Sequence, residues 1–597
     1  MPGLAIIISS KAPESNRQDL DCMVASIRHE SFYVSGTYCD ESLGLYVGWA
    51  CRPGSYGDGM PIRSEDGNFL LFFYGEHLSD PQTSVDRKPS DEGPGALTVL
   101  QLFRVHGLDA LQRLNGWFHG VLVDVKSREI TVFNDRFGMQ RLYTVEESGE
   151  TFFASEAKAL LAIRRHLRRL DPRGVGEFLS CGCVLENRSL FEKVTRLPAA
   201  TVRTFNGEHG SRERYYFKPE QWETQVPLTA SEFRDALEEI LPRAVQRCLS
   251  SRQAIGVSLT GGFDTRLIMA CLASFGTLLP SYTFGGMYRD CFDVLIARSV
   301  AKICGCSHRV LSLGTTFLQS FATLADKTVY LSDGCLGATN AYELYLNSLA
   351  RHVAPVRLTG SYGSEVMRGA RAFKAVPPTP GLISPDFQSY IDDGVRNFNA
   401  LGLGHPISFS VFKQAPWYYA NRLTVEQSQV TIRTPFMDND FVGLFYRRTN
   451  DFGDGKILAR DLISQRQPDL ARLPTDTGNC SFLRHHWAQF LFKADYCYKS
   501  GMPQWLEQVH YLLGRVSPER FIIGRHRFAH FRVWFRNQLA PYIKEMLLDR
   551  RTAERGYFDP KFVEQMVHRH VKGERNYTDD IERVLTLELT CRQFVDA

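Results

Sequence analysis

Apolar and polar residues alternate with two different periods along this chain, and the period changes near residue 205. Before that point, apolar runs of strand length are separated by turn residues. The clearest runs are LAIII (4–8), NFLLFFYG (68–75), FHGVLVDV (118–125), EITVFND (129–135) and LYTVEES (142–148). A helix is expected at SEAKALLAI (155–163), with Ser155 as its N-cap and Glu156 suited to the positive helix end. These runs predict a strand-rich N-terminal domain.

From about residue 228, apolar positions recur at helical spacing, and short buried strands are expected between the helices. The helical segments are SEFRDALEEILPRAVQRCL (231–249) and DVLIARSVAKICG (293–305), and the strands lie in 254–259, SYTFGG (281–286) and the start of APVRLTGSYGSEVMRG (354–369). Strands that alternate with helices indicate a parallel sheet.

The two patterns predict a chain of two domains. An α+β domain is expected over 1–205, a polar, glycine-containing linker over 206–230, and a doubly wound α/β domain with a helical C-terminal part over 231–597. At 597 residues, the chain is long enough for a separate core in each domain.

One strand of the second domain breaks into the turn TGGFDT (260–265) before a helix begins. Its two glycines have no Cβ, so their N–H groups can approach a phosphate, and the helix N-terminus favours the negative charge. Asp264 would repel a phosphate unless a hard cation lay between them. The Gly-Lys-Ser/Thr of the Walker loop is absent. The turn therefore indicates a nucleotide polyphosphate bound with Mg²⁺, although glycine followed by aspartate is also ordinary turn chemistry.

The composition is that of an ordinary globular protein, with 44% hydrophobic and 23% charged residues. A net charge of +4 on this length gives no reason to expect a nucleic-acid or membrane partner. The apolar run near the start is too short for a secretory signal, and no run reaches membrane-spanning length. A soluble cytoplasmic protein is expected, and its 14 scattered cysteines are expected to be reduced thiols.

The chain resembles the glutamine-dependent asparagine synthetases over nearly its whole length. TGGFDT (260–265) is similar to the family's pyrophosphate loop Ser-Gly-Gly-x-Asp-Ser. LNGWFHGVLVD (114–124), NDRFGMQRLY (134–143), FASEAKALL (153–161) and IRTPFMDNDFV (432–442) resemble further family segments in the same order. The resemblance implies a class II glutamine amidotransferase-like (Ntn) β-sandwich followed by an adenine-nucleotide α-hydrolase-like domain with a parallel sheet.

The resemblance also implies a reaction and its residues. A small-molecule or peptide carboxylate would react with ATP to form an acyl-adenylate, and ammonia or an amine would then displace AMP. Asp264 and Glu365 would hold Mg²⁺. The nucleotide would be bound by the turn and by residues at the strand ends, namely Leu259, Thr260, Gly261, Gly262, Asp264, Thr265, Phe284, Thr359 and Gly360. For Phe284, packing at a strand end is the competing interpretation.

The N-terminal half departs from the family at two places. Pro2 stands where the family has the cysteine nucleophile of its glutaminase, and Tyr74-Gly75-Glu76 replaces the family's Asn-Gly-Glu, whose asparagine resembles an oxyanion donor. We therefore expect this domain to be a scaffold without glutaminase activity. The amine would then be free ammonia, ammonia from a partner, or an amino group on another molecule.

The second glycine loop, Thr359-Gly360-Ser361-Tyr362-Gly363-Ser364-Glu365, departs from the family's Ser-Gly-x-Gly-x-Asp-Glu. An ungapped match places Ser364 at the metal-binding aspartate, and a shift by one residue places Glu365 there. We favour Glu365, because Mg²⁺ between phosphates prefers a second carboxylate to a hydroxyl. The shift also places Tyr362 where β-lactam and carbapenam synthetases carry a catalytic tyrosine; a half-buried tyrosine beside a strand end is the alternative.

Three other functional readings stay open. The relatives that lost the cysteine suggest an intramolecular, ring-forming reaction in natural-product tailoring. Serines at 361 and 364, where acids are expected, suggest a nucleotide-binding pseudoenzyme. The segment GRHRFAHFRVWFR (524–536) has the basic and aromatic composition of a nucleic-acid binder, but an amphipathic helix explains it more simply. No transition-state lysine is assigned, and a homodimer is compatible with the resemblance.

Overall fold

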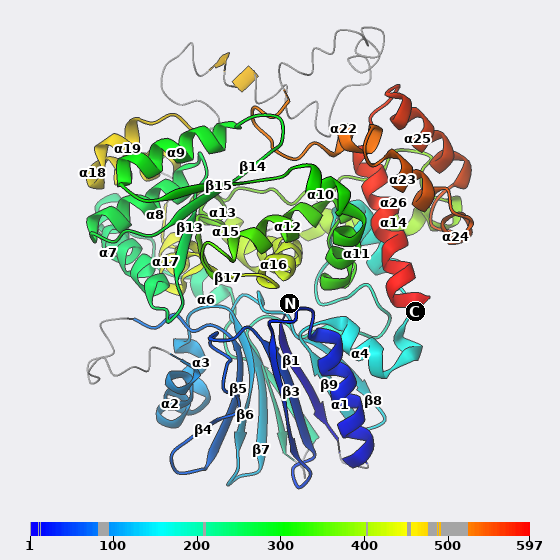
Figure 1. Ribbon diagram of the computed structural model, residues 1–597. Coiled ribbons are helices and arrows are strands. Elements are labelled where there is room, and N and C mark those ends of the chain that lie inside the picture. The colour runs from blue at the N-terminus through cyan, green and yellow to red at the C-terminus, as the bar shows by residue number, and fades with distance from the viewer. Residues whose placement is uncertain are drawn as a thin grey trace.

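The computed structural model describes residues 2–9, 11, 13–80, 95–206, 210–401, 404–449, 455–475, 486–487, 489–490 and 523–596. Within them, an antiparallel β-sandwich carries an α/β domain with a parallel sheet, as Figure 1 shows, with the sandwich at the bottom. The predicted fold class is confirmed in both halves.

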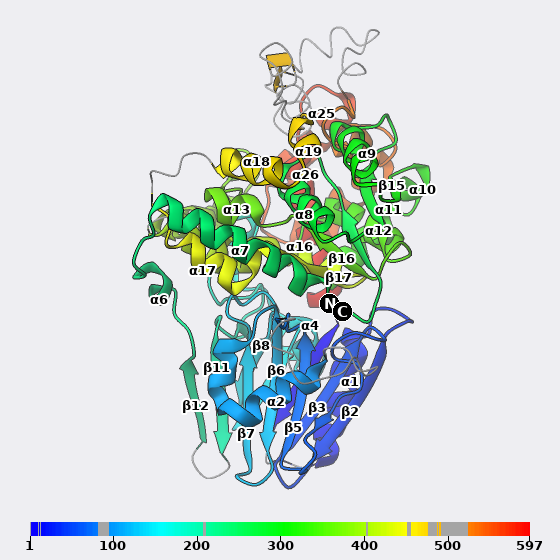
Figure 2. The same cartoon turned by 90° about the vertical axis from the view of Figure 1, so that its left-hand side faces the viewer.

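The sandwich consists of two six-stranded sheets, seen below the α/β domain in Figure 2. One has the order β10-β8-β9-β1-β3-β2 and the other β12-β11-β7-β6-β5-β4. The strands of the first are β1 (Gly3–Ile8), β2 (Val34–Asp40), β3 (Leu45–Cys51), β8 (Tyr143–Glu147), β9 (Glu150–Ala154) and β10 (Thr195–Arg196). Those of the second are β4 (Ile62–Arg63), β5 (Phe69–Gly75), β6 (Phe118–Asp124), β7 (Glu129–Asn134), β11 (Thr201–Asn206) and β12 (Gly210–Tyr215).

Strand β1 shows why its sequence is an unbroken apolar run. Leu4 and Ile6 lie in the core between the two sheets, whereas Ala5 and Ile7 belong to a second cluster that includes residues of helix α1 (Pro13–Ile27). Successive side chains of a strand point to opposite faces, and here both faces are covered. All five predicted strand runs correspond to strands of the sandwich.

The helix predicted at 155–163 is present as α4 (Ala157–Ile163), but its expected N-cap is wrong. The N-cap residue is Glu156, which makes no side-chain capping bond. Ser155 instead accepts a hydrogen bond from the Leu4 backbone N at 2.7 Å, and its Oγ lies 2.9 Å from Nε2 of His119. Ser155 thus bonds to residues of β1 and β6 and not to its own helix. The sequence around Ser155 gives no sign of these distant contacts.

The second domain is built on a five-stranded sheet of order β15-β14-β13-β16-β17, and all of its strand pairs are parallel. Its strands are β13 (Ile255–Ser258), β14 (Ser281–Gly285), β15 (His308–Ser312), β16 (Val356–Thr359) and β17 (Thr431–Arg433). Helices that surround the sheet include α7 (Ala230–Leu249), α8 (Phe263–Ser274), α9 (Phe292–Cys304), α12 (Ala341–Ala350), α13 (Gly363–Arg368), α16 (Ala420–Gln427), α17 (Asn439–Phe445) and α18 (Gly455–Arg466). The C-terminal helices are α22 (Phe531–Arg536), α23 (Ala540–Leu547), α24 (Arg550–Glu554), α25 (Pro560–Lys572) and α26 (Thr578–Thr590).

The connection between the domains is shorter than predicted. Residues 210–215, which the sequence assigned to the linker, form β12 and pair with β11 at the edge of the sandwich. Helix α7 begins at Ala230 with a capping box between Thr229 and Glu232. The remaining connection, 216–229, includes the short helix α6 (Glu220–Glu223).

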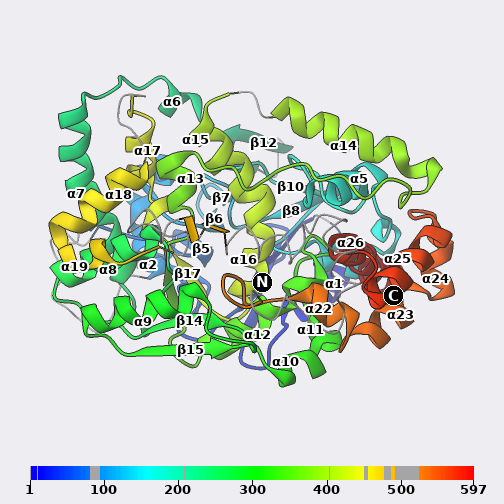
Figure 3. The same ribbon diagram turned by 90° about the horizontal axis from the view of Figure 1, so that it is seen from above.

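The two domains are joined by buried ionic contacts. Lys158 Nζ of the sandwich lies 2.9 Å from Asp333 Oδ1, and Arg433 Nη2 of the α/β domain lies 2.7 Å from Glu76 Oε1. Helix α14 (Gln388–Leu401) also lies along α5 (Pro172–Cys181) of the N-terminal half, as seen in Figure 3. These contacts hold the two domains together.

The segment 524–536 does not present an aromatic surface. Phe531, Arg532, Trp534 and Phe535 of helix α22 are each at most 4% exposed. The helix covers only 531–536 and Arg532 is buried in it, so the predicted amphipathic helix over 524–536 is found only in part. Within the described ranges, no helix is long and apolar enough to span a membrane, and no three His, Cys, Asp or Glu side chains converge in a way that would hold a metal. Lys493 and Lys499, two lysines of the C-terminal half to which no transition-state role was assigned, lie outside the described residues, as does His485.

Candidate functional site

The two glycine loops of the α/β domain lie side by side. Strands β13 and β16 are neighbours in the sheet, with Ser258 opposite Thr359, so the loops that follow them leave the same edge. A Cβ on Gly360 would lie 2.6 Å from the backbone N of Thr265, and one on Gly363 would lie 2.7 Å from Cγ of Asp264. Glycine is required at both positions because the loops touch.

The turn at 260–265, called here the phosphate turn after its predicted role, connects β13 to α8. One of its N–H groups already binds a carboxylate oxygen. The N–H of Gly261 donates to Oδ1 of Asp293 at 2.6 Å. The hydroxyls of Thr260 and Thr265 are 3.1 Å apart, and Gly262 is the N-cap residue of α8. The donors expected from the sequence lie together at a helix N-terminus, a place that favours phosphate, but the N–H of Gly261 is taken by Asp293 in this structure.

Asp264 meets the second loop through Ser364. Ser364 Oγ donates to Oδ2 of Asp264 at 2.8 Å, and Arg368 donates to the same serine hydroxyl. Glu365 accepts a hydrogen bond from the Tyr419 hydroxyl at 2.8 Å. The direct neighbour of Asp264 is thus Ser364, the residue of the ungapped match, while Glu365 approaches from the adjacent position of α13.

A cavity of about 260 Å³ opens beside these groups. It is bordered by both loops and by one face of α16, through Asp264, Gly360, Ser361, Tyr362, Ser364, Glu365, Tyr419, Arg422, Leu423 and Glu426. Both carboxylates predicted to hold Mg²⁺ therefore border one cavity. This donor set fits Mg²⁺, which in nucleotide sites is bound by one or two carboxylates together with phosphate oxygens and water.

Burial shifts the titration of two cavity residues. It raises the pKa of Glu365 above its ordinary value; the negative charge of Asp264 acts in the same direction, and the hydrogen bond from Tyr419 opposes it. Burial also raises the pKa of Tyr362 well above its ordinary value. Tyr362 has a left-handed φ of 71°, which is uncommon for a residue with a Cβ.

Four of the residues predicted to bind the nucleotide, Leu259, Phe284, Thr359 and Gly360, lie at the carboxyl ends of strands, and not all of them reach the cavity. Leu259 and Thr359 are buried at 1% and 5% exposure, and only Gly360 borders the cavity. Phe284, at the end of β14, is half-buried, and the guanidinium of Arg357 lies 5.2 Å from its ring centroid. Their role in nucleotide binding stays a prediction.

Sequence reasoning missed the wall of the cavity opposite the phosphate turn. Tyr419, Arg422, Leu423 and Glu426 come from the end of a π-helix (Ser410–Tyr419) and from α16. Their spacing of three, one and three residues places them on one face of a helix. In the sequence, this spacing was the only sign that the four side chains act together. Nothing in the local sequence connects that face to loops that lie about 60 and about 160 residues earlier.

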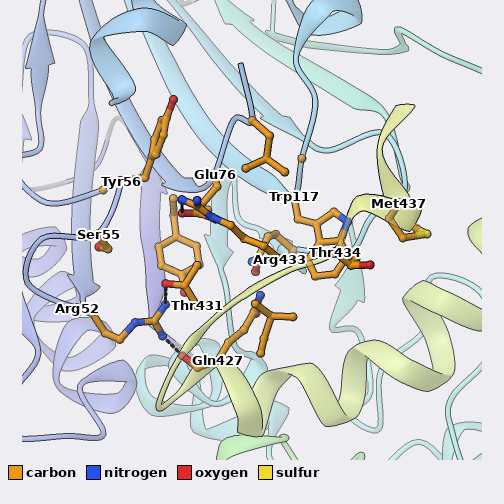
Figure 4. Close-up of a pocket in the computed structure, with 17 residues that line it drawn as sticks. Arg52, Ser55, Tyr56, Glu76, Trp117, Gln427, Thr431, Arg433, Thr434 and Met437 are labelled. Carbon is orange, nitrogen blue, oxygen red and sulfur yellow. Dashed lines mark hydrogen bonds and ion pairs between the residues drawn. The ribbon is translucent and has the colours of Figure 1, made fainter. Parts of the chain in front are cut away.

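A second, smaller cavity of about 50 Å³ lies between the two domains (Figure 4). Arg52 of the sandwich donates to Oγ1 of Thr431 at 2.7 Å and to the carbonyl of Gln427. Glu76 accepts two hydrogen bonds from Arg433, at 2.7 and 2.8 Å. Tyr74 lines this cavity and no cysteine does, within the described residues. Its charged groups are thus already paired across the domain interface.

Comparison with known proteins finds similarity in both halves. Residues 1–216 match the family model described as a glutamine amidotransferase domain, and residues 236–402 and 519–592 match the model described as asparagine synthase. The chain is 22% identical over 560 residues to the glutamine-hydrolysing asparagine synthetase 1 of Bacillus subtilis, covering 88% of this chain and 86% of that protein.

Other relatives match over less of their length. The glutamine-hydrolysing asparagine synthetase 2 of Bacillus subtilis is 23% identical over 423 residues, which are 66% of this chain and 54% of the relative. Asparagine synthetase 1 of Saccharomyces cerevisiae is 27% identical over 223 residues, which are 36% of this chain and 33% of the relative. The chain thus spans about half or less of the length of these two curated relatives.

Proposed function

The chain belongs to the asparagine synthetase family, and we propose from this premise that it is a C–N ligase that forms an amide bond while ATP is cleaved to AMP and pyrophosphate. One observation carries the proposal: two glycine loops from neighbouring strands bring Asp264 and Glu365 to the border of one cavity, beside donors suited to phosphate. By analogy with the names of its relatives, aspartate is the first acid to test.

The proposed reaction has two steps. A carboxylate oxygen of the acid attacks the α-phosphorus of ATP, the bond between that phosphorus and the bridging oxygen breaks, and pyrophosphate leaves. The nitrogen of ammonia or an amine then attacks the acyl carbon, the acyl–oxygen bond breaks, AMP leaves, and the nitrogen loses a proton. The N–H group of Gly262 and the hydroxyls of Thr260 and Thr265 would stabilise charge on the departing pyrophosphate, and the N–H of Gly261 would do so once it exchanges Asp293 for a phosphate oxygen. Asp264 and Glu365 would hold Mg²⁺, which neutralises charge on the polyphosphate.

Two features of the smaller cavity support a sandwich domain that does not hydrolyse glutamine. Tyr74 stands at the place of the family's asparagine, and the charged groups of Arg52 and Glu76 are already paired with the other domain. The expected source of nitrogen is therefore free ammonia or an amine. The oligomeric state stays a prediction.

Purified protein with ATP, Mg²⁺ and aspartate is expected to release pyrophosphate when ammonia is supplied and not when glutamine is the sole nitrogen source. Pyrophosphate is followed enzymatically, and glutamate formation from glutamine is measured in the same samples. Glutamate appearing faster than in a protein-free blank would contradict the loss of glutaminase. If neither sample releases pyrophosphate, aspartate is not the substrate and other acids are tested.

Two alternatives are each favoured by one contact. Tyr362 borders the cavity, as a ring-forming enzyme of the β-lactam synthetase type would require, and in that case a single substrate releases pyrophosphate without added amine. Ser364 in direct contact with Asp264 favours a pseudoenzyme, which binds ATP and releases no pyrophosphate with any acid.

At low Mg²⁺, the rate of pyrophosphate release is expected to fall as the pH is lowered, because protons and Mg²⁺ compete for the carboxylate of Glu365. Burial raises the pKa of Glu365, and only the ionised carboxylate can hold Mg²⁺. Because the pKa of Glu365 is higher in the folded than in the unfolded protein, protonation of this residue stabilises the folded state. The loss of rate at low pH is therefore not caused by unfolding through protonation of Glu365. Glu365→Gln should give a low rate without this acid limb. A profile that is unchanged in the variant would contradict the assignment.

A further inference from the structure

The guanidinium of Arg266 is buried next to the phosphate turn. Gly262 is the N-cap residue of α8, and Arg266 follows it by four positions. The residue is only 1% exposed and does not border the larger cavity. Burial of a guanidinium is costly unless its donors are satisfied, and a positive charge near a helix N-terminus opposes the helix dipole. The reason for an arginine at this position must therefore lie in the groups that it contacts.

The two terminal nitrogens of Arg266 donate hydrogen bonds to four backbone carbonyls. Nη1 donates to those of Leu470 and Leu473 at 3.2 and 2.9 Å, and Nη2 donates to those of Pro474 and Gly261 at 2.8 and 3.1 Å. Three of these acceptors lie at or just after the end of helix α19 (Pro468–Arg472), where the last carbonyls of a helix need partners from outside it. The helix dipole favours a cation at this end. Arg266 thus joins the end of α19 to the phosphate turn.

The bond to Gly261 fixes the direction of a neighbouring donor. The carbonyl of Gly261 and the N–H of Gly262 belong to one planar, trans peptide group, so they point in opposite directions. Arg266 holds this carbonyl toward the buried guanidinium, which turns the N–H of Gly262 away from it. That N–H lies 3.4 Å from Oγ1 of Thr260. A charged partner on the carbonyl also polarises the peptide group, which strengthens its N–H as a donor.

The preceding peptide group is fixed as well. The N–H of Gly261 donates to Oδ1 of Asp293 at 2.6 Å, and Asp293 lies in the first turn of α9. Two consecutive peptide groups of the phosphate turn are therefore held by charged side chains from outside it. The guanidinium of Arg266 has little freedom itself, because its central carbon lies 5.3 Å from the ring centroid of Phe263 and its nitrogens bond to the end of α19. A turn that is fixed before the ligand binds offers donors that need no reorganisation during the reaction.

We propose that Arg266 is a positioning residue, which holds the N–H of Gly262 toward the pyrophosphate group of ATP without touching the ligand itself. The inference rests on the proposed function for the identity of the ligand, and it adds a residue outside the cavity on which the electrostatic role of the turn depends. Lysine cannot replace Arg266 fully. An ammonium is a point charge with three donors, whereas the guanidinium is a fork that spans four carbonyls.

The test measures the binding of two probes to the full-length protein by isothermal titration calorimetry in the presence of Mg²⁺. Inorganic pyrophosphate presents the group that the phosphate turn is proposed to bind, and AMP lacks it. Arg266→Met is expected to bind pyrophosphate about tenfold more weakly than the wild type does, which corresponds to the loss of one well-oriented hydrogen bond. Its affinity for AMP should be unchanged. A variant that is only less stable would not separate the two probes.

Arg266→Lys keeps the test decisive if the methionine variant does not fold. It retains the charge and part of the hydrogen bonding, so it should lose about threefold in affinity for pyrophosphate and keep its affinity for AMP. An Arg266→Lys protein that binds both probes as the wild type does would overturn the positioning role.

Arg196→Met is the matched control. Arg196 is 8% exposed, lies on β10 of the sandwich, and likewise donates to backbone carbonyls, namely those of Val184, Glu186 and Arg188. This variant should lose stability as Arg266→Met does and bind both probes with wild-type affinity. Equal weakening of pyrophosphate and AMP binding in Arg266→Met would contradict the positioning role, and so would the same loss of pyrophosphate affinity in Arg196→Met.

Pyrophosphate release from ATP separates this inference from the proposed function. A wild-type protein whose affinity for pyrophosphate depends on Arg266, but which releases no pyrophosphate with any acid, keeps the positioning role and loses the proposed function. A wild-type protein that releases pyrophosphate, together with two Arg266 variants of unchanged pyrophosphate affinity, keeps the proposed function and loses the positioning role.

Discussion

Asp264→Asn is expected to lower ATP-dependent pyrophosphate release by about 100-fold or more, while the protein stays folded. The substitution keeps the shape of the side chain and its hydrogen-bonding capacity toward Ser364, but it removes one of the two carboxylates proposed to hold Mg²⁺. Removing one electrostatic partner of a transition state costs about 100-fold to 1,000-fold in rate. The measurement is the initial rate of pyrophosphate formation at saturating ATP, compared at several Mg²⁺ concentrations.

Asp235→Asn is the control for this variant. Asp235 is an exposed carboxylate on α7, so its neutralisation changes net charge by the same amount and should leave the rate unchanged. If Asp264→Asn kept the wild-type rate and the same Mg²⁺ dependence, the metal assignment would be wrong. The pseudoenzyme alternative would then also have to be examined in the wild type, by comparing ATP binding with pyrophosphate release.

Gly360→Ala is expected to reduce the same rate by about 100-fold, because displacement of catalytic groups by about 1 Å can cost that much. The new Cβ would lie 2.6 Å from the backbone N of Thr265 and 2.9 Å from the backbone C of Asp264. Neither backbone atom can rotate away, so the two loops must separate. Overpacking of this kind costs about 1–3 kcal/mol of stability, which denaturant unfolding measures alongside the kinetics.

Gly314→Ala provides the matched control, since a Cβ at Gly314 meets no atom within 4 Å and the residue has an extended φ of −147°. It should keep the rate and lose at most about 1 kcal/mol of stability, because Gly314 is the N-cap residue of helix α10 (Thr315–Gln319), where alanine is less favourable than glycine. A Gly360→Ala protein with the wild-type rate would show that the contact between the loops is not needed for the proposed reaction.

Much of the fold could be predicted from the local pattern of apolar and polar residues. The apolar run of β1 and the helical spacing of α7 and α9 were correctly assigned, because periodicity reports directly which faces a strand or helix buries. The parallel sheet followed from the alternation of strands and helices. The prediction of Ser155 as an N-cap was wrong, because its hydroxyl accepts a hydrogen bond from the backbone of β1 instead. The predicted end of the N-terminal domain was wrong because the edge strand β12 is exposed at every position, so no apolar pattern marks it.

The strand, turn and helix around 260–265 were also readable from the sequence by itself, since two glycines, two threonines and an aspartate between a strand and a helix describe their own local geometry. Phosphate binding by this turn stays a prediction. The sequence did not show whether Ser364 or Glu365 lies beside Asp264. Adjacent residues on a helix point about 100° apart, and only the packing of α13 against the phosphate turn decides which of them faces Asp264. Tertiary structure likewise determined the wall of Tyr419, Arg422 and Glu426. The order of strands in the sheet brings that wall to the loops, and no local periodicity encodes the order of strands.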